Sequence, residues 1–287
     1  MDLLSELGEG GLLGELEQRG LAAGMDAEGL VLVDGHVVTQ DTLVEGIHFR
    51  LAWTSWRDLG YKAAAVNLSD LAAMGAEPEA LVVSLAVLPT TGLASVVELY
   101  EGLAEVSVPV LGGDTTRAEP MFLTVAAVGR SERVPGRAGA KPGDALVVTG
   151  PLGAAAAGLH ALERELRGFD ELVERHHRPP VRLVEGRELA RVAHAMVDLS
   201  DGIGRDAGRI AERSGCKVVI DADAVPKAPR LGEVADLPFW TMGEDYELLA
   251  ALAPDDAAAS GFPVVGHCEN GSGVEPSGLT GWDSFGA

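Results

Sequence analysis

The chain has 287 residues, 47% of them hydrophobic, which is enough for one large domain or two ordinary ones with a sizeable core. Its 44 acidic residues outnumber its 22 basic ones and give a formal net charge of −22, which argues against nucleic acid and anionic membranes as partners. Phosphate ligands stay compatible with this charge if metal ions mediate their binding.

Three further features predict a cytoplasmic protein. No apolar run reaches the length of a membrane span, and the N-terminus, Met1-Asp2-Leu3, lacks the basic start of a signal peptide. The two cysteines, Cys216 and Cys268, lie far apart in the sequence and have no metal-like spacing. We therefore expect free thiols in a reducing compartment.

The first half of the chain alternates predicted helices and strands. The Asp34-Gly35 pair between two apolar runs is typical of a hairpin turn. The predicted helices lie within 1–24, 53–75 and 91–107, and the predicted strands are 30–33, 36–39, 81–88, 108–111 and 121–128.

Acidic residues recur beside these elements. We expect Asp41 and Asp114 at strand ends, where ligands are often bound, and Asp114 follows two glycines that let the backbone approach a ligand closely. Asp70 lies in the long helix among alanines that indicate close packing, and a buried carboxylate needs a partner such as a metal ion. His48 by itself is more typical of a structural histidine than of a ligand.

A stretch rich in Arg, Gly and Pro at 131–142 predicts a boundary between two domains, 1–137 and 138–287. His176 and His177 are expected in a surface turn. The second domain is predicted to contain helices ending near 167 and covering 181–193 and 205–214, and strands at 145–149, before Asp198, at 218–220 and at 262–267.

The segment Asp198-Leu199-Ser200-Asp201-Gly202 predicts a strand, a tight turn and a helix N-terminus. A helix N-terminus attracts anions. Two carboxylates there would repel an anion, because two charges about 4 Å apart cost roughly 4 kcal/mol in a partly screened site. A cation must lie between them, and Mg²⁺, which binds oxygen ligands and shares them with phosphates, is the natural candidate.

Two other interpretations of this segment are open at this point. Gly202-x-Gly204-x-x-Ala207 fits the weak dinucleotide-binding fingerprint, with Asp221 near the position of its ribose-binding acid. Alternatively, Ser200 or Asp201 only caps a helix in an ordinary α/β unit.

The whole chain favours metal-assisted phosphate chemistry. It contains no P-loop, no set of protein-kinase motifs and no nucleophile elbow. Converging carboxylates suit several Mg²⁺ ions that hold a polyphosphate. The acids that stand at predicted strand ends, beside glycine or on the long helix are Asp26, Asp41, Asp70, Asp114, Asp198 and Asp201.

Six stretches match the motifs of one family in order. They are DTLVEGIHF (41–49), YKAAAVNLSDLAAMGA (61–76), GGDTTR (112–117), GAKPGD (139–144), DLSDG (198–202) and GEDYEL (243–248). The chain thereby resembles the thiamine-monophosphate kinases of the aminoimidazole-ribotide-synthetase-like superfamily over almost its whole length. So many ordered matches outweigh the capped-helix and dinucleotide interpretations.

The resemblance implies direct in-line, Mg²⁺-assisted transfer of the γ-phosphate of ATP to thiamine monophosphate, giving thiamine diphosphate and ADP. The implied catalytic residues are Asp201 and Arg137. The implied Mg²⁺ ligands are Asp26, Thr39, Gln40, Asp41, Asp70, Asp114, Asp198 and Asp201. The implied ATP contacts are Tyr100, Gly113, Asp114, Arg137 and Ser200. The implied thiamine-phosphate contacts are His48, Glu244 and Trp282.

The resemblance also implies the fold and the assembly. It implies two α/β (α+β) domains, with the N-terminal domains pairing in a homodimer that closes a β-barrel across its interface, and the C-terminal domain covering the nucleotide cleft. Both substrates are anionic, so positioning and charge neutralisation should dominate catalysis. Arg137 would supply fixed positive charge, and Trp282 could stack on the cationic thiazolium or the pyrimidine.

Three positions depart from the family pattern. Met25 stands where an acid is usual, Gln40 replaces a hydroxyl residue, and Met242 replaces a glycine. Two alternatives therefore stay open: a sister enzyme that uses ATP on another acceptor, and a nucleotide-binding protein without turnover. ATP binding without ADP production under saturating Mg²⁺ would identify the second.

Overall fold

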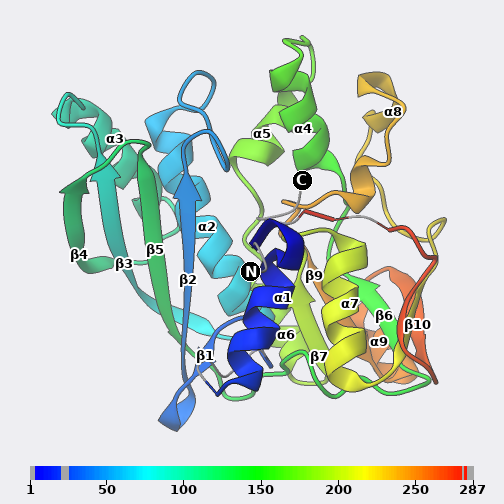
Figure 1. Cartoon of the computed structure of the whole chain (residues 1–287). Helices are drawn as coiled ribbons and strands as arrows, with labels where there is room; N and C mark the ends of the chain where they lie inside the picture. Colours follow the sequence, from blue (N-terminus) through cyan, green and yellow to red (C-terminus); the bar gives the residue numbers. More distant parts are fainter. Residues whose placement is uncertain (1–3, 21–25, 280, 283–287) are drawn as a thin grey trace.

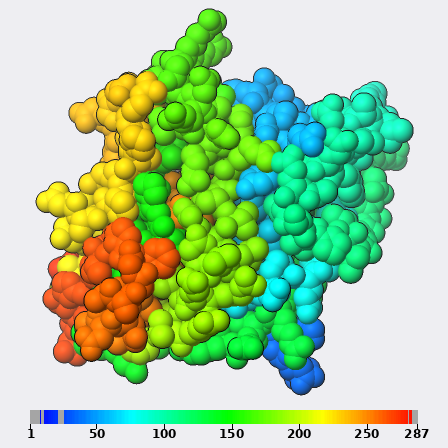
Figure 2. Space-filling view, turned by 180° about the vertical axis from the view of Figure 1, so that it is seen from behind, coloured from blue at the N-terminus to red at the C-terminus, as the bar shows by residue number. Residues whose placement is uncertain are grey.

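Two β-sheets, each packed against helices, form the architecture of the computed structural model, which describes residues 4–20, 26–279 and 281–282. The sheets lie side by side (Figure 1), and from behind a light-green surface separates the orange and red surface of the C-terminal residues from the cyan surface of the N-terminal half (Figure 2). The predicted two-domain α/β fold is confirmed, whereas the division between residues 137 and 138 stays a prediction.

The first sheet is built from the N-terminal half of the chain. Its strands are β1 (Leu30–Val31), β2 (His36–Val44), β3 (Glu77–Val87), β4 (Val110–Arg117) and β5 (Phe122–Arg130). Their order is β1-β2-β5-β3-β4, and only β3 and β4 are parallel, joined by helix α3 (Leu93–Ala104). The predicted Asp34-Gly35 turn joins β1 to β2, with φ of 61° and 78° at its two residues.

Helices α2 (Trp56–Ala73) and α3 cover one face of this sheet. Side chains alternate along β3, so that Leu81 and Leu85 are buried while Val82 between them is 40% exposed. Ser55 begins α2 by accepting a hydrogen bond from the backbone N–H of Asp58 at 3.0 Å. Within the described residues, no helix covers the opposite face of the sheet (Figure 1).

The second sheet has six short strands from the C-terminal half. They are β6 (Ala145–Val148), β7 (Ala195–Asp198), β8 (Lys217–Ile220), β9 (Leu248–Leu252), β10 (Val264–Glu269) and β11 (Gly273–Glu275). Their order is β11-β8-β10-β6-β9-β7. As predicted, β7 leads through a tight turn into helix α7 (Ile203–Ser214).

This order contradicts the dinucleotide-binding interpretation. The fingerprint requires a βαβ unit of parallel strands, with its glycines at the first turn. Here β7 and β8 lie far apart in the sheet, and each pairs antiparallel with a different neighbour, β9 and β10. Gly204 instead packs against Leu279 near the end of the chain, where an added Cβ would lie 2.4 Å from the leucine Cβ.

The other helices surround and connect the two sheets. They are α1 (Leu4–Gln18), α4 (Ala154–Glu163), α5 (Asp170–His177), α6 (Leu183–Ala190), α8 (Leu231–Val234) and α9 (Pro254–Ser260). Helices α5 and α6 pack against α2, and α1 lies beside α7 (Figure 1). Short 3₁₀ turns occur at 33–35 and 239–241. None of the helices in the described part of the chain is long and apolar enough to cross a membrane.

Several local predictions are wrong. Asp41 lies inside β2 and Asp114 inside β4, because both strands continue by pairing with β5 and β3. His176 and His177 form the last turn of α5 and are buried, since α5 packs against α4 and α2. Pro179 and Pro180 then prevent the helix from continuing.

Candidate active site

Three carboxylates from separate parts of the chain converge between the two sheets. Glu28 precedes β1, Asp70 lies near the end of α2, and Asp198 is the last residue of β7. One oxygen from each lies within 4.8 Å of the others. The predicted convergence is thus confirmed for Asp70 and Asp198, and it joins the N-terminal and C-terminal halves of the molecule.

Polar residues of α2 and β2 hold two members of this carboxylate cluster (Glu28, Asp70 and Asp198) in place. The hydroxyl of Ser69 donates to Asp198 Oδ2 at 2.7 Å, and the hydroxyl of Thr39 donates to Asp70 Oδ2. The side-chain oxygen of Asn67 accepts a hydrogen bond from the backbone N–H of Asp41 at 3.1 Å. Asp70 is therefore closely packed and has a polar partner, as the alanine-rich sequence around it predicts.

Burial and mutual repulsion make the cluster unfavourable without a cation. Burial, followed by the charge of Glu28, raises the pKa of Asp198 to about 8. Burial, followed by the charges of Asp41 and Asp198, raises the pKa of Asp70 well above its usual value. The donors are all oxygen atoms, which is the set that hard cations such as Mg²⁺ prefer, so the residues present fit that ion.

Arg137 lies directly beside the cluster. Its Nε donates to Glu28 Oε1 at 3.1 Å, and its terminal nitrogen contacts Glu28 Oε2. Both side chains are largely buried, with exposed fractions of 12% and 6%. The backbone N–H of Arg137 also donates to the carbonyl of Asp26 at 2.6 Å. The predicted arginine therefore places fixed positive charge next to the cluster.

The turn between β7 and α7 presents Asp201 on the same side of the molecule. Gly202 begins α7, and Asp206 Oδ2 accepts hydrogen bonds from the backbone N–H groups of Asp201 (3.1 Å) and Gly202 (3.0 Å). Capping by the side chain of Ser200 or Asp201 is wrong, because the N-cap residue is Gly202, which has no side chain to accept a hydrogen bond. The carboxylate of Asp201 instead contacts the guanidinium groups of Arg209 and, at 3.5 Å, Arg205.

A second loop, residues 243–246, packs against this turn. The backbone N–H of Glu244 donates to the carbonyl of Ser200 at 2.7 Å, and that of Tyr246 donates to Leu199 at 3.0 Å. A Cβ on Gly243 would lie 2.1 Å from the carbonyl oxygen of Ser200, so this approach requires glycine. The loop thereby fixes Glu244 beside the turn that carries Asp201.

A lysine and two histidines lie around Glu244, the residue expected to contact the acceptor substrate. Lys62 Nζ lies 3.0 Å from Glu244 Oε1, and His176 Nδ1 lies 3.1 Å from Oε2. Burial lowers the pKa of His48, and the charges of Glu244 and Lys62 act on it in opposite directions. His48 Nδ1 accepts a hydrogen bond from the backbone N–H of Val44 at 3.1 Å. His48 and Glu244 are thus brought together.

Trp282, the third predicted thiamine-phosphate contact, is tied to the same turn by its backbone. Its N–H donates to the carbonyl of Asp201 at 2.9 Å, and its carbonyl accepts from Arg205. Its side chain is 53% exposed. The end of the described chain therefore reaches the residues that follow β7.

Other predicted residues lie away from the cluster within this chain. The side chain of Gln40 is exposed on the face of β2 opposite to Thr39 and Asp41. Gly113 and Asp114 lie on the edge strand β4, and Tyr100 lies on α3 against the core of the first sheet. Asp26 is exposed and lies 3.5 Å from Arg213, and Met25 lies outside the described residues.

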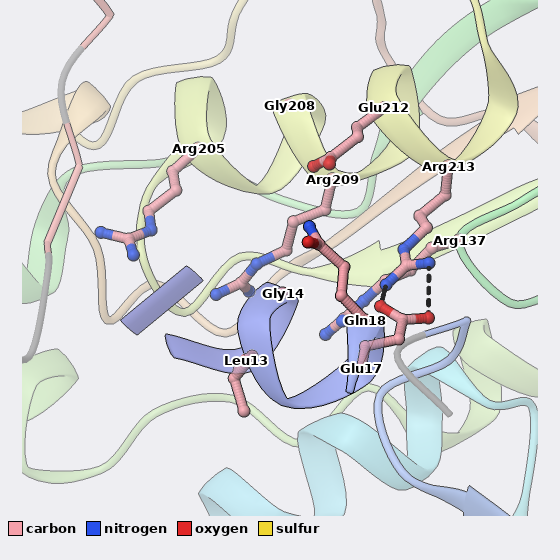
Figure 3. A pocket seen from close by; sticks show the side chains of 10 residues that line it. All are labelled: Leu13, Gly14, Glu17, Gln18, Arg137, Arg205, Gly208, Arg209, Glu212 and Arg213. Carbon is pink, nitrogen blue, oxygen red and sulfur yellow. Dashed lines mark hydrogen bonds and ion pairs between the residues drawn. The ribbon is translucent and has the colours of Figure 1, made fainter. Parts of the chain in front are cut away.

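A cavity of about 680 Å³ lies between α1 and α7, beside Arg137 (Figure 3). Arg205, Arg209 and Arg213 follow one another at four-residue spacing along α7, so they share one face of the helix. They line the cavity together with Arg137, and Glu17 of α1 pairs with Arg213 at 2.7 Å. Each of these arginines already contacts a carboxylate, so a phosphate ligand in the cavity would exchange with those partners for the guanidinium groups.

Sequence reasoning missed four residues of this site. Lys62 stands inside a stretch that matched the family, but a lysine in a helix ordinarily predicts an exposed side chain. Glu28 lies outside the family motifs, and Arg209 lies on a helix with many charged residues, where single members cannot be told apart. His176 was assigned to the surface, yet it is only 3% exposed.

Comparisons with known proteins identify relatives over most of the chain. Residues 24–131 match the family model of AIR synthase related protein, N-terminal domain, and residues 141–261 match that of the C-terminal domain. Thiamine-monophosphate kinase of Salmonella typhimurium is 42% identical over 227 residues, covering 74% of this chain and 69% of its own. The Mycobacterium tuberculosis (strain H37Rv) enzyme of that name is 35% identical over 289 residues, covering 93% and 86%.

A solved structure shows the same similarity in three dimensions. It is described as AaThiL complexed with AMPPCP and TMP, and it superposes with a TM-score of 0.89 at 30% sequence identity. The superposition covers 99% of both chains. The similarity therefore extends through both sheets and the region between them.

Proposed function

The chain belongs to the thiamine-monophosphate kinase family, and from this we propose that it catalyses the ATP-dependent phosphorylation of thiamine monophosphate to thiamine diphosphate. The observation that carries this proposal is the convergence of Glu28, Asp70 and Asp198 beside Arg137. Carboxylates and an arginine in one place are what a transfer between two anionic substrates requires.

Magnesium is the proposed metal of the site. Asp70 and Asp198 would be central ligands, and Thr39 and Asp41 face them from β2. The further proposed ligands are Asp26, Asp114 and Asp201, whereas Gln40, whose side chain lies on the opposite face of β2, could contribute only through its backbone carbonyl. When bound, Mg²⁺ supplies positive charge that neutralises the phosphate oxygens of both substrates. Ser69 and Thr39 orient the carboxylates through the hydrogen bonds described above.

The protein's own groups then position the two substrates. Arg137 would hold phosphate oxygens of ATP from its place on Glu28, beside the arginine-lined cavity, and Ser200 would contact ATP from the turn that also carries Asp201. Glu244, His48 and Trp282 would hold thiamine monophosphate at the other end of the site. Direct in-line transfer needs no covalent intermediate on the protein, so positioning supplies most of the catalysis.

A homodimer would complete the nucleotide site. Gly113 and Asp114 lie on β4, at the opposite edge of the first sheet from β1 and β2, and Tyr100 lies on the neighbouring helix α3. If two such sheets close a β-barrel across a two-fold axis, β4 of one subunit lies near β2 of the other. We propose that Tyr100, Gly113 and Asp114 reach the site of the partner subunit in this way.

The proposed location is the cytoplasm. Cys216 and Cys268 are both free and buried, and burial raises the pKa of Cys268 to about 12. Thiols kept in this form suit a reducing compartment.

The first experiment measures ADP release from ATP and Mg²⁺ with and without thiamine monophosphate. The expected result is ADP release that depends on thiamine monophosphate, with thiamine diphosphate appearing at the same rate. ATP binding without turnover would contradict the proposal and favour a nucleotide-binding protein. ADP release that is insensitive to thiamine monophosphate but responds to another phosphate or carbonyl acceptor would instead favour a sister enzyme.

A further inference from the structure

The ion pair between Lys62 and Glu244 is arranged with the ammonium behind the carboxylate. Lys62 Nζ lies 3.0 Å from Glu244 Oε1. The lysine side chain is 1% exposed, whereas the glutamate side chain is 28% exposed. A ligand can therefore approach the carboxylate from the solvent side but cannot reach the ammonium by that route.

A histidine from a third element lies beside the same carboxylate without forming a hydrogen bond of good geometry to it. His176, in the last turn of α5, places Nδ1 3.1 Å from Glu244 Oε2 and is itself buried. Each oxygen of Glu244 therefore has one inner neighbour, Lys62 from α2 or His176 from α5. Although burial opposes the charged form of Glu244, Lys62 and His176 lower its pKa well below the usual value.

Stability alone does not explain this arrangement. A buried ion pair contributes little net stability compared with an apolar pair of similar volume, because both charges lose their hydration. Glu244 also adopts φ of 67°, a left-handed conformation that is unfavourable for a residue other than glycine. Backbone strain of this kind persists only where the surrounding structure enforces it, and it is concentrated at active sites and ligand-binding positions.

The position of the pair along α2 relates it to the carboxylate cluster. Lys62 and Asp70 are eight residues apart, so they lie on one face of the helix and about 12 Å apart along its axis. Lysine side chains on a helix point toward its N-terminus, which directs Lys62 away from Asp70. An acceptor whose phosphate lies at the cluster can therefore extend its ring system toward Glu244.

We propose that Lys62 is a positioning residue for the acceptor: its ammonium, which donates a hydrogen bond to Glu244 Oε1, fixes the Glu244 carboxylate toward thiamine monophosphate. This inference rests on the proposed function, in which Glu244 contacts that substrate. It assigns Lys62 no contact with ATP and no part in the phosphoryl transfer itself.

The test compares Lys62→Met with the wild-type enzyme. The variant should raise the KM for thiamine monophosphate roughly 10- to 100-fold, the factor that corresponds to a misplaced charge-assisted hydrogen bond. The KM for ATP and the kcat at saturating thiamine monophosphate should change by less than about threefold, because the lost interaction is one of binding. Lys227→Met is the matched control, since Lys227 is an exposed lysine of the second half.

A double-mutant cycle shows whether Lys62 acts through Glu244. Adding Lys62→Met to Glu244→Gln should raise the KM for thiamine monophosphate no further than Glu244→Gln alone, because the carboxylate is already absent. Lys62→Arg, which keeps the positive charge, should recover part of the affinity. Equal effects on the KM of both substrates, or additive effects in the cycle, would overturn the proposal.

Two further results separate this proposal from its premise. Lys62→Met leaves the charge of Glu244 uncompensated and could fail to fold for that reason. In that case Lys62→Met/Glu244→Gln, which removes both charges, replaces it. A wild-type KM for thiamine monophosphate in the double variant would overturn the positioning role of Lys62. A wild-type enzyme without turnover on thiamine monophosphate would instead refute the proposed function. Normal wild-type turnover together with an unchanged KM in folded Lys62→Met refutes the role of Lys62 alone.

Discussion

At the scale of single residues, the carboxylate cluster provides ligands for a cation but lowers the stability of the protein when no cation is bound. Burial and the charge of Glu28 disfavour ionised Asp198, whose oxygens are held in place by Ser69. The unfolded chain is free of this repulsion. Without metal, the repulsion therefore lowers the free energy of unfolding. Stability and function should therefore respond in opposite directions to a change at Asp198.

Asp198→Asn tests this opposition. In EDTA near pH 7, the variant should raise the free energy of unfolding by about 1 to 3 kcal/mol, because the raised pKa keeps Asp198 largely protonated in the native state while the unfolded chain gains by ionising it, and the amide removes this difference. With Mg²⁺ and both substrates, turnover should fall roughly 100-fold or more. Urea unfolding and the ADP assay measure the two effects. Asp236→Asn, at an exposed position, is the control, and a loss of stability in EDTA at Asp198 would contradict the argument.

His177 should make the stability of the protein depend on pH. Burial, followed by the charge of His176, lowers the pKa of His177 to about 4 in the folded state. The unfolded chain binds this proton near the ordinary pKa of about 6.5, so it takes up more protons than the native state between these values. The free energy of unfolding should therefore fall as the pH falls from about 6.5 to 4.

The measurement is urea unfolding of wild type and His177→Gln at pH 7 and pH 5. The glutamine variant should lose less stability than wild type between the two values, because it has no group to protonate. His267→Gln should behave like wild type, since His267 is 51% exposed and pairs with Glu269. An identical pH dependence in wild type and His177→Gln would show that His177 is not the responsible group.

At the scale of elements, strand β4 depends on one of two adjacent glycines. Gly113 has φ of 153°, and a Cβ added there would lie 1.8 Å from the carbonyl oxygen of Val83 in β3. A Cβ on Gly112 would meet nothing within 4 Å. The parallel pairing of β4 with β3 continues through Asp114 because Gly113 permits this close approach.

Alanine at the two positions should have different effects. Gly113→Ala should lower the free energy of unfolding by roughly 2 to 4 kcal/mol, combining steric overlap with an unfavourable backbone conformation. Gly112→Ala should stay within about 0.5 kcal/mol of wild type. Chemical unfolding of both variants under one set of conditions measures the difference. Equal stabilities would mean that β4 can move away from β3 without cost.

Local sequence patterns predict helices and strands well where no contact with a distant segment is needed to form them. The apolar run before Asp198 and the helical spacing after Gly202 predict β7 and α7, and both are present. The hydrogen bonds that hold the turn before α7 could not be predicted, because Asp206 reaches back from inside the helix to the backbone of Asp201 and Gly202. The burial of His176 likewise depends on the packing of α5 against α2, which no local pattern encodes.

The candidate site was predictable for those residues to which the family resemblance assigns a role. Asp70, Asp198 and Arg137 were expected and lie together. Glu28 and Lys62 were not, because their roles arise from contacts between segments far apart in the sequence. Lys62 and Glu244 are separated by 182 positions, and only the meeting of α2 with the 243–246 loop reveals their pairing.

At the scale of the whole molecule, α2 connects the two halves. One end carries Lys62 against the Glu244 loop, and the other carries Ser69 and Asp70 against β7. Helix α1 adds a second connection, because Glu17 pairs with Arg213 of α7 (Figure 3). Contacts of this kind fix the distance between the acceptor subsite and the carboxylate cluster.

The uncovered face of the first sheet leads to a prediction about assembly. Val82 lies on a central strand of that face, between Ala126 of β5 and Gly112 of β4, and it is 40% exposed. A half-exposed apolar side chain on such a face is typical of a surface that a second subunit covers. Closing a barrel there would also bring Asp114 of one subunit to the carboxylate cluster of the other.

Val82→Glu should therefore convert a dimer into a monomer and remove activity together. Two glutamates in the closed interface would be buried without partners, which costs several kcal/mol per charge. In the isolated subunit the same side chain faces water, so the fold should remain. Sedimentation equilibrium, circular dichroism and the ADP assay measure assembly, folding and turnover. Val264→Glu, at an exposed valine of the second sheet, is the control. A folded monomer of Val82→Glu with wild-type turnover would contradict the shared site, because each subunit would then be complete on its own.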